Sequence, residues 1–193
     1  MRHVISALCA SFLFAYPALS EGADAIAFAG VPWRSSVAAV KSVMTERGFT
    51  FQNADDAGDL QFSGNVLGED SIVFALFNSE GELVKWSVVL VTPDDRTLAR
   101  YRELKAQLTE RYGDPFGEVE EWGYPYDGGD HVGREAMAIR RGKAALMAGW
   151  QTPDTSFPSV VVEVTDRMTV RASYEGPGWK AEADLRRAKR PLF

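Results

Sequence analysis

Residues 71–115 constrain the fold of this chain more than any other stretch, because they hold two long apolar strand patterns followed by a sharply delimited helix. Residues 71–78 read Ser-Ile-Val-Phe-Ala-Leu-Phe-Asn, an apolar run of strand length that is typical of a strand covered on both faces. In residues 83–91 apolar side chains recur at alternate positions, which indicates a strand with one covered face. The side chains expected on that face are Val84, Trp86, Val88 and Leu90. A two-residue loop at Glu80-Gly81 would make the two strands a hairpin.

A helix is predicted directly after this hairpin. Thr92 can accept hydrogen bonds from the first helical N–H groups, Pro93 lies where no N–H is needed, and two aspartates follow at the positive end of the helix dipole. Apolar residues then recur every three or four positions and form one stripe, which we expect to pack on the sheet: Leu98, Tyr101, Leu104, Leu108 and Tyr112. The run Gly113-Asp114-Pro115 should end the helix.

A first helix and a further strand are predicted before residue 71. Ser35 or Ser36 can cap a helix in which Val37, Val40 and Met44 share a face, and Gly48 suits its C-terminal end. Residues 53–59 resemble an acidic turn. After this turn Leu60, Phe62 and Val66 alternate with polar residues, as in a half-exposed strand.

Two more hairpins are predicted after residue 135. In the first, strands on either side of an Arg141-Gly142 loop would pair Met137 with Leu146 and Ile139 with Ala144. In that arrangement Trp150 belongs to the core, as Trp86 does in the earlier hairpin. We also considered whether residues 72–91 and 136–150 are copies of one unit, although they share no motif.

The second of these hairpins, in residues 160–174, allows a choice between two registers. A three-residue loop through Met168 places Val164 opposite Val170 and Glu163 opposite Arg171, whereas a two-residue loop places Glu163 opposite Val170. We predict the three-residue loop, because it pairs apolar with apolar and opposite charges with each other. The tail, residues 179–190, reads as a charged helix with a thin apolar stripe of Ala181, Leu185 and Ala188.

These elements predict an α+β fold. Runs of neighbouring antiparallel strands with few helices indicate an antiparallel sheet of about seven strands, with the two main helices packed on one face and a C-terminal helix added. The length of residues 21–193 is suited to a single α+β domain.

The first twenty residues have the features of a secretory signal peptide. Arg2 precedes an apolar core that is too short to span a bilayer, and small residues lead to a cleavage site expected after Ser20. The single cysteine, Cys9, lies inside that core, so lipidation is not expected and the exported form would contain no thiol. We therefore expect a periplasmic or secreted protein that uses no thiol catalysis, disulfide or cysteine-bound metal.

Charge excludes one class of partner. Removal of Arg2 with the leader leaves 20 basic and 27 acidic residues, a net charge of −7, which gives no electrostatic route to general nucleic-acid binding. After the leader no apolar stretch reaches membrane-spanning length, and no phosphate-cradling glycine motif occurs, so neither a transmembrane segment nor a nucleotide cofactor is expected. The sequence leaves the oligomeric state open.

Two short patterns resemble a group of uncharacterised exported bacterial proteins built as small α+β modules. They are Gly30-Val31-Pro32-Trp33 before a serine-capped helix and Tyr112-Gly113-Asp114-Pro115 at a helix end, within residues 28–116. The chain departs from the pattern at Arg34, where a glycine would be expected. Similar helix-on-sheet modules occur in envelope-assembly lipoproteins and in secreted enzyme inhibitors, so the resemblance implies protein binding and carries over no catalytic residue.

A loop rich in aromatic and acidic residues is the candidate binding region. Its aromatic residues alternate, which could present one face to a sugar, a peptide or a partner protein. The residues proposed for contact are Trp122, Tyr124, Tyr126, Asp127, Asp130 and His131. From this loop we predict a non-catalytic module that contacts a protein or a component of the cell envelope.

Two alternatives stay open. His131 with Asp127 and Asp130 could form the centre of a hydrolase or, with Glu120 or Glu121, a divalent-metal site, although no nucleophile motif and no known metal spacing accompanies them. We therefore predict no catalytic residue, no metal ligand and no cofactor. The other alternative is a structural component of the cell envelope.

Overall fold

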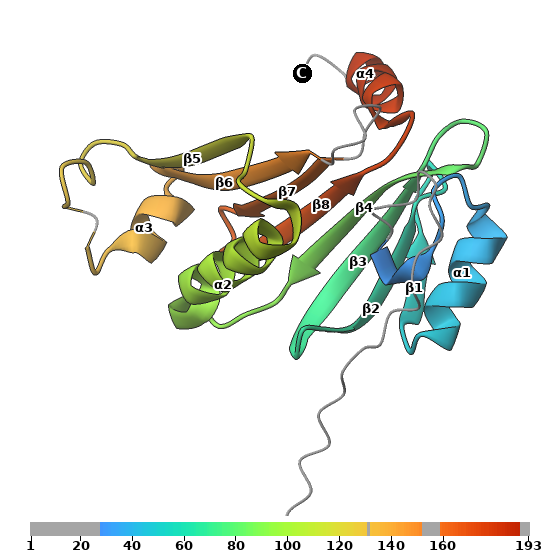
Figure 1. Ribbon diagram of the computed structural model, residues 1–193, viewed down its shortest axis with the longest axis horizontal. Helices are drawn as coiled ribbons and strands as arrows, with labels where there is room; N and C mark the ends of the chain where they lie inside the picture. The colour runs from blue at the N-terminus through green and yellow to red at the C-terminus, as the bar shows by residue number, and fades with distance from the viewer. Residues whose placement is uncertain (1–27, 131, 152–158, 190–193) are drawn as a thin grey trace, which may run out of the picture.

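The described strands form one sheet. In the computed structural model, which describes residues 28–130, 132–151 and 159–189, eight antiparallel strands lie in the order β1-β2-β3-β4-β8-β7-β6-β5 (Figure 1). The predicted α+β class is confirmed, with eight strands in place of about seven. The predicted signal peptide and Cys9 lie outside the described residues, as does the rest of the chain before Phe28.

The two halves of the chain share one order of elements, a helix and then four strands, and the second half adds two further helices. The first half contains a short 3-10 helix at Phe28–Gly30, then α1 (Val37–Glu46), β1 (Thr50–Ala54), β2 (Leu60–Val66), β3 (Glu69–Phe77) and β4 (Leu83–Leu90). The second half contains α2 (Asp94–Tyr112), β5 (Gly117–Trp122), α3 (Glu135–Arg140), β6 (Ala144–Gln151), β7 (Ser159–Val164), β8 (Val170–Glu175) and α4 (Trp179–Lys189). Each half is thus a helix followed by a four-stranded meander, and the halves join where β4 pairs with β8. The hairpin predicted in residues 136–150 is wrong, because these residues contain α3 and β6; the question whether they copy residues 72–91 therefore no longer applies.

Local chemistry sets the ends of the two main helices. The Ser36 side chain accepts a hydrogen bond from the Ala39 N–H at 3.3 Å, so the predicted cap of α1 is confirmed at Ser36. Thr92 does not cap α2; its hydroxyl bonds instead to the Thr97 hydroxyl at 3.0 Å. The predicted end of α2 is confirmed, with Gly113 in a positive-φ conformation that glycine adopts without a steric penalty.

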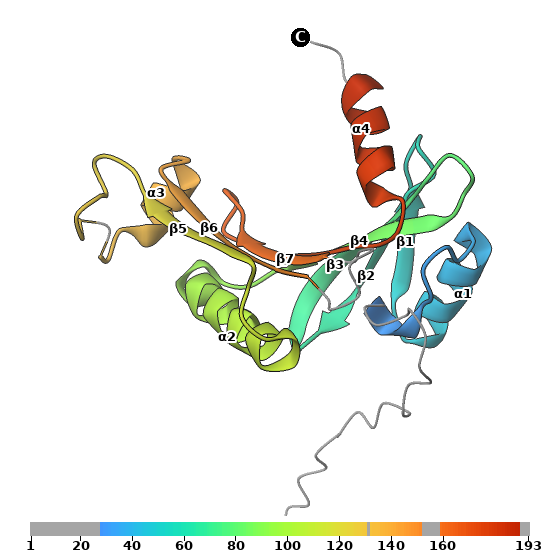
Figure 2. The same cartoon turned by 45° about the horizontal axis from the view of Figure 1, so that its top comes forward.

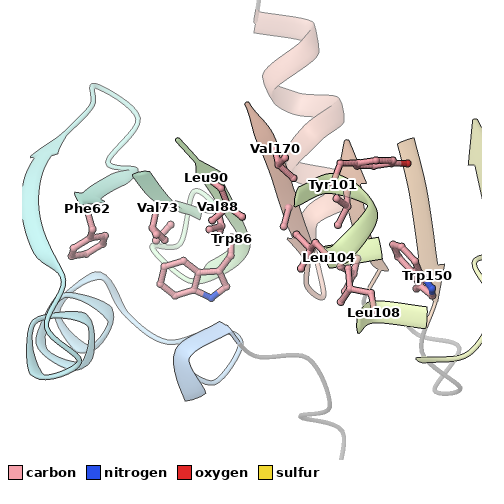
Figure 3. Close-up of a cluster of buried hydrophobic side chains, with 14 of the residues drawn as sticks. Phe62, Val73, Trp86, Val88, Leu90, Tyr101, Leu104, Leu108, Trp150 and Val170 are labelled. Atoms are coloured by element: carbon pink, nitrogen blue, oxygen red, sulfur yellow. The ribbon is translucent and has the colours of Figure 1, made fainter. Parts of the chain in front are cut away.

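The core lies between the sheet and helices α1 and α2. Every second residue of the central strands points to this side, and the predicted set of Val84, Trp86, Val88 and Leu90 is buried as expected. Leu104 and Leu108 of α2 and the buried Trp150 of β6 close the same core (Figure 3). The Trp150 indole N–H also donates to the Gly113 carbonyl at 3.0 Å, which ties β6 to the end of α2.

Two edge strands and one helix differ from the prediction. The sequence predicts a turn over part of β1 and a loop in place of β5, because both strands are short and polar, and β5 carries three glutamates. Edge strands commonly carry such residues, since charge discourages pairing with other chains. The strand predicted at residues 136–140 is the helix α3, in which Ala138 and Ile139 are buried. Its alanines and methionine favour helix, and the alternation of Met137 and Ile139 was misleading.

The two hairpin loops gave one confirmed and one corrected prediction. Val164 pairs with Val170 and Glu163 with Arg171, so the three-residue loop between β7 and β8 is confirmed. Between β3 and β4 the predicted two-residue loop is wrong. The Asn78 N–H donates to the Glu82 carbonyl at 2.9 Å, which leaves three residues in the loop, and Gly81 takes a positive φ there.

Helix α4 is present as predicted, but its contact face is different. Leu185 of the expected apolar stripe is 52% exposed, and Ala181 and Ala188 are exposed as well. The half-buried residues of α4 are Trp179, Glu182, Ala183 and Arg186, one helical face that is mainly polar. Among the helices described, none is long and apolar enough to span a membrane.

A candidate binding groove on the open sheet face

The sheet has one face that helices cover and one that they leave largely open. Figure 2 shows α1 and α2 on one side of the sheet and α4 rising from the other. We call the side away from α1 and α2 the open face. Side chains at alternate positions of the strands point to it, including Phe74, Val89 and Val161, and these three are only half-buried.

A groove of about 590 Å³ runs across this open face. Its lining comes from β3, β4, β8, β7 and β6, five neighbouring strands, and from the turn between β1 and β2. The lining residues are Asp55, Asp59, Phe74, Leu76, Lys85, Ser87, Val89, Met147, Val161, Glu163, Arg171, Ser173 and Glu175. With strands about 4.8 Å apart, the groove extends about 20 Å across the sheet.

The middle of the groove is polar, and its charges are paired. Lys85 bonds Glu175 at 3.0 Å across the β4–β8 pair, and Glu175 also accepts from the Ser159 hydroxyl at 3.1 Å. Arg171 bonds Glu163 across the β7–β8 pair at 2.6 Å. Because each charge already has a partner, this strip can accept polar groups of a ligand while holding its own geometry.

Apolar side chains flank the polar strip on both sides. Phe74, Leu76 and Val89 lie on the first half of the sheet. On the second half Met147 is 41% exposed, and Phe116 beside it is 63% exposed. Phe116 rests on Gly149, since a Cβ there would come within 3.0 Å of its ring. Because Gly149 has no side chain, the Phe116 ring can lie directly on the sheet, and the other face of the ring is exposed to solvent.

One lining residue of the groove, Asp59, forms an ion pair with α4, although no residue of α4 itself lines the groove. The Arg186 guanidinium forks onto both carboxylate oxygens of Asp59, and its NH2 group also donates to the Phe77 carbonyl at 2.6 Å. The hydrogen bond to Asp59 raises the pKa of Arg186 above its already high usual value. The guanidinium is thus a permanent cation held at the mouth of the groove.

The structure divides the aromatic side chains of the predicted binding loop. Tyr124 is 80% exposed, but Tyr126 is only 1% exposed. The Tyr126 hydroxyl accepts a hydrogen bond from Arg141 at 3.1 Å, and Arg134 lies over its ring. Trp122 is half-buried against the core at the end of β5. The three residues therefore do not form one aromatic face, and only Tyr124 is freely available to a partner.

The acidic residues of the loop lie apart from the groove. Asp127 and Asp130 are exposed, and neither lines the groove; His131 lies outside the described residues. Glu120 faces α2 with its neighbour Glu118, which pairs with Lys105 of that helix, whereas Glu121 points to the opposite face of β5. Within the part of the chain that the structure describes, no cluster of three or more His, Cys, Asp or Glu side chains could hold a metal ion.

Comparison with known proteins adds no assignment. No family model matches the chain, and no curated protein or solved structure matches it either. The resemblance to small exported α+β modules therefore stays a prediction.

The groove was not identified from the sequence, although a signal for it was present. Residues 71–78 have the pattern of a strand covered on both faces, yet Ile72, Phe74 and Leu76 are only half-buried because no helix packs over them. A doubly apolar strand in an antiparallel sheet with few helices indicates that apolar side chains will be left on the less covered face.

Proposed function

We propose that this protein is a non-catalytic binding module that holds a segment of another protein in the groove on the open sheet face. The observation that carries the proposal is the apolar surface of β3 and β6 on the face of the sheet that the described helices leave largely open. Contiguous exposed apolar surface with a polar surround is typical of protein interaction sites.

The shape and chemistry of the groove favour a polypeptide over a small molecule. It is shallow and extended, whereas small-molecule sites are enclosed cavities lined mainly by apolar groups. Paired charges in the centre and apolar residues on both flanks suit a partner that carries apolar anchors on either side of a polar segment. Among the lining residues, the carboxylates Glu163 and Glu175 are committed to ion pairs, which does not favour a general base there.

The proposed location follows from the leader. A signal peptide at residues 1–20 would place the protein in the periplasm or outside the cell, where a partner from the envelope is available. Tyr124 and the exposed aspartates of the loop would then be a secondary contact beside the main groove.

Affinity capture with point variants tests this proposal. The mature protein, immobilised, is exposed to an envelope extract of the source organism, and proteins bound by wild type are compared with those bound by Phe74→Glu and Met147→Glu, since the residues opposite Phe74 are the uncharged Gln61 and Ser87. A charge placed on either apolar flank should remove a specific partner, because a carboxylate buried in an interface without a counter-ion is strongly unfavourable.

Two control variants make the result specific. Leu185→Glu adds the same charge on the exposed side of α4, away from the groove lining, and should leave capture unchanged. Tyr124→Ala alters the loop alone. If the two groove variants keep every partner and Tyr124→Ala loses them, the contact region is the loop and the groove proposal is wrong.

A further inference from the structure

Helix α4 is held to the rest of the protein differently from α1 and α2. Those two helices bury apolar stripes in the core, whereas α4 has no buried residue. Its inward face presents Trp179, Glu182 and Arg186, and its leucine faces solvent. The position of α4 therefore depends mainly on polar contacts.

Arg186 is the centre of those contacts. Besides its fork on Asp59, it bonds Glu182 of its own helix at 2.8 Å and the Phe77 carbonyl at 2.6 Å. Asp59 is itself fixed, because its carboxylate accepts from the Phe77 N–H at 2.9 Å and its N–H donates to Asp55 at 2.9 Å. We call the Arg186–Asp59–Phe77 contact the latch. A bidentate charged contact of this kind is strong but short-ranged, so it has two states, made or broken.

The chain before α4 provides a hinge. Residues 176–178 are Gly-Pro-Gly, and Gly178 has a φ of +87°. Gly176 is fixed to the sheet, since its N–H donates to the Val84 carbonyl at 2.8 Å and the Trp33 ring lies against it. Rotation at Gly178 would break the hydrogen bond from the Trp179 N–H to the Gly176 carbonyl, at 3.1 Å, and would leave the pairing of β8 with its neighbours in place.

The latch and the groove share residues. Asp59 lines the groove and accepts from Arg186, and Lys85 lines it while its ammonium lies 4.4 Å from the centre of the Trp179 ring. We propose that α4 is a gate on the groove: with the latch made, α4 closes the Asp59 end, and with the latch broken, α4 swings out on its glycine hinge and opens that end to a longer ligand. This inference rests on the proposed function, since it assigns regulation to the same groove.

The position of α4 can be measured without any ligand. Nitroxide labels are attached to cysteines introduced as Asn53→Cys on β1 and Ala188→Cys on α4, both exposed positions, in the full chain carrying Cys9→Ser. Double electron–electron resonance should give one narrow distance distribution in this background. Adding Arg186→Gln should broaden it, because a glutamine cannot fork onto a carboxylate.

The neighbouring arginine supplies the matched control. Arg187 is exposed and, among the described residues, bonds Asp184 of its own helix alone, so Arg187→Gln should leave the distribution narrow. Arg186→Gln leaves the Asp59 carboxylate without a counter-ion and could prevent folding. The double variant Asp59→Asn with Arg186→Gln avoids this, because the neutral side chain placed at position 59 can still accept the hydrogen bond from the Phe77 N–H. A narrow distribution in both latch variants, or a broad one in the background protein, would overturn the gate.

A second measurement asks whether the movement opens the groove. A thiol introduced as Leu76→Cys lies in the groove directly across from Lys85. Its reaction with a bulky maleimide should be at least about tenfold faster with Arg186→Gln than with Arg187→Gln, in line with the loss of a charged hydrogen bond. Equal rates would mean that α4 moves without gating, which refutes the inference and leaves the binding proposal to its own capture test.

Discussion

Gly176→Ala is the sharpest stability test that this structure offers. A Cβ built on Gly176 lies 2.4 Å from two atoms of the Trp33 ring, far inside van der Waals contact. Trp33 belongs to the core cluster and cannot simply swing into solvent. The backbone at Gly176 does not have a positive φ, so the penalty comes from the side chain and not from conformational strain.

The magnitude follows from two opposing effects. Overfilling a packed core by a methyl group costs about 1–3 kcal/mol, and replacing glycine at a permitted backbone conformation returns about 0.4–1 kcal/mol through the unfolded chain. We expect the free energy of unfolding to fall by about 1–2 kcal/mol, which lowers Tm by about 2–8 °C for a chain of this size. Urea titration followed by tryptophan fluorescence measures it.

Gly117→Ala is the matched control. Gly117 also lacks a positive φ, but nothing lies within 4 Å of its added Cβ, so this change should raise the free energy of unfolding by about 0.4–1 kcal/mol. Shrinking the ring by Trp33→Leu should make Gly176→Ala tolerated, with a coupling energy above about 0.5 kcal/mol. If Gly176→Ala is stabilising, or if Trp33→Leu leaves its cost unchanged, the contact does not limit this position.

Three further predictions follow from other elements. Leu108→Ala should cost about 2–5 kcal/mol because it leaves a cavity beneath α2, whereas Leu185→Ala on the exposed side of α4 should stay within about 0.5 kcal/mol; thermal unfolding of both variants compares them. Burial and two nearby carboxylates of β5 raise the pKa of Tyr101 to about 12, so the contribution of Tyr101 to stability should be constant well below pH 10 and fall by about 2 kcal/mol as pH rises from 10 to 12, and Tyr101→Phe should remove that part of the fall. A double-mutant cycle on Glu163 and Arg171 should give a coupling of about 0.2–1 kcal/mol, since the pair is partly exposed; a value above about 2 kcal/mol would contradict this.

The sequence predicted well those elements whose pattern and chemistry agree. Trp86 and Leu90 are buried because alternation and β-propensity coincide in β4, and the register of β7 with β8 was predictable because a one-residue slip would place Glu163 against Val170. Edge strands were harder. β5 is defined by its pairing with β6 and not by an apolar face of its own, so its glutamates resembled a loop.

The candidate site was less predictable for a physical reason. Aromatic residues in the loop at residues 122–126 were expected to be exposed, but Tyr126 has a buried ring with a hydrogen-bonded hydroxyl. The groove is assembled from alternate residues of strands far apart in sequence, such as Leu76 and Met147. The apolar run of β3 indicates that both of its faces are apolar, but it does not indicate which face the helices leave open.

The position of β8 has a consequence for how this protein is made. β8 is the last of the described strands, yet it lies in the middle of the sheet and pairs with β4, whose residues come 80 to 90 positions earlier. Until β8 is in place, β4 has a free edge of high β-propensity, which is a surface for pairing between unfinished chains. A chain that stops before Val170 would therefore lack the strand that joins the two halves of the sheet. The edge of β4 would then stay unpaired and open to association with other chains.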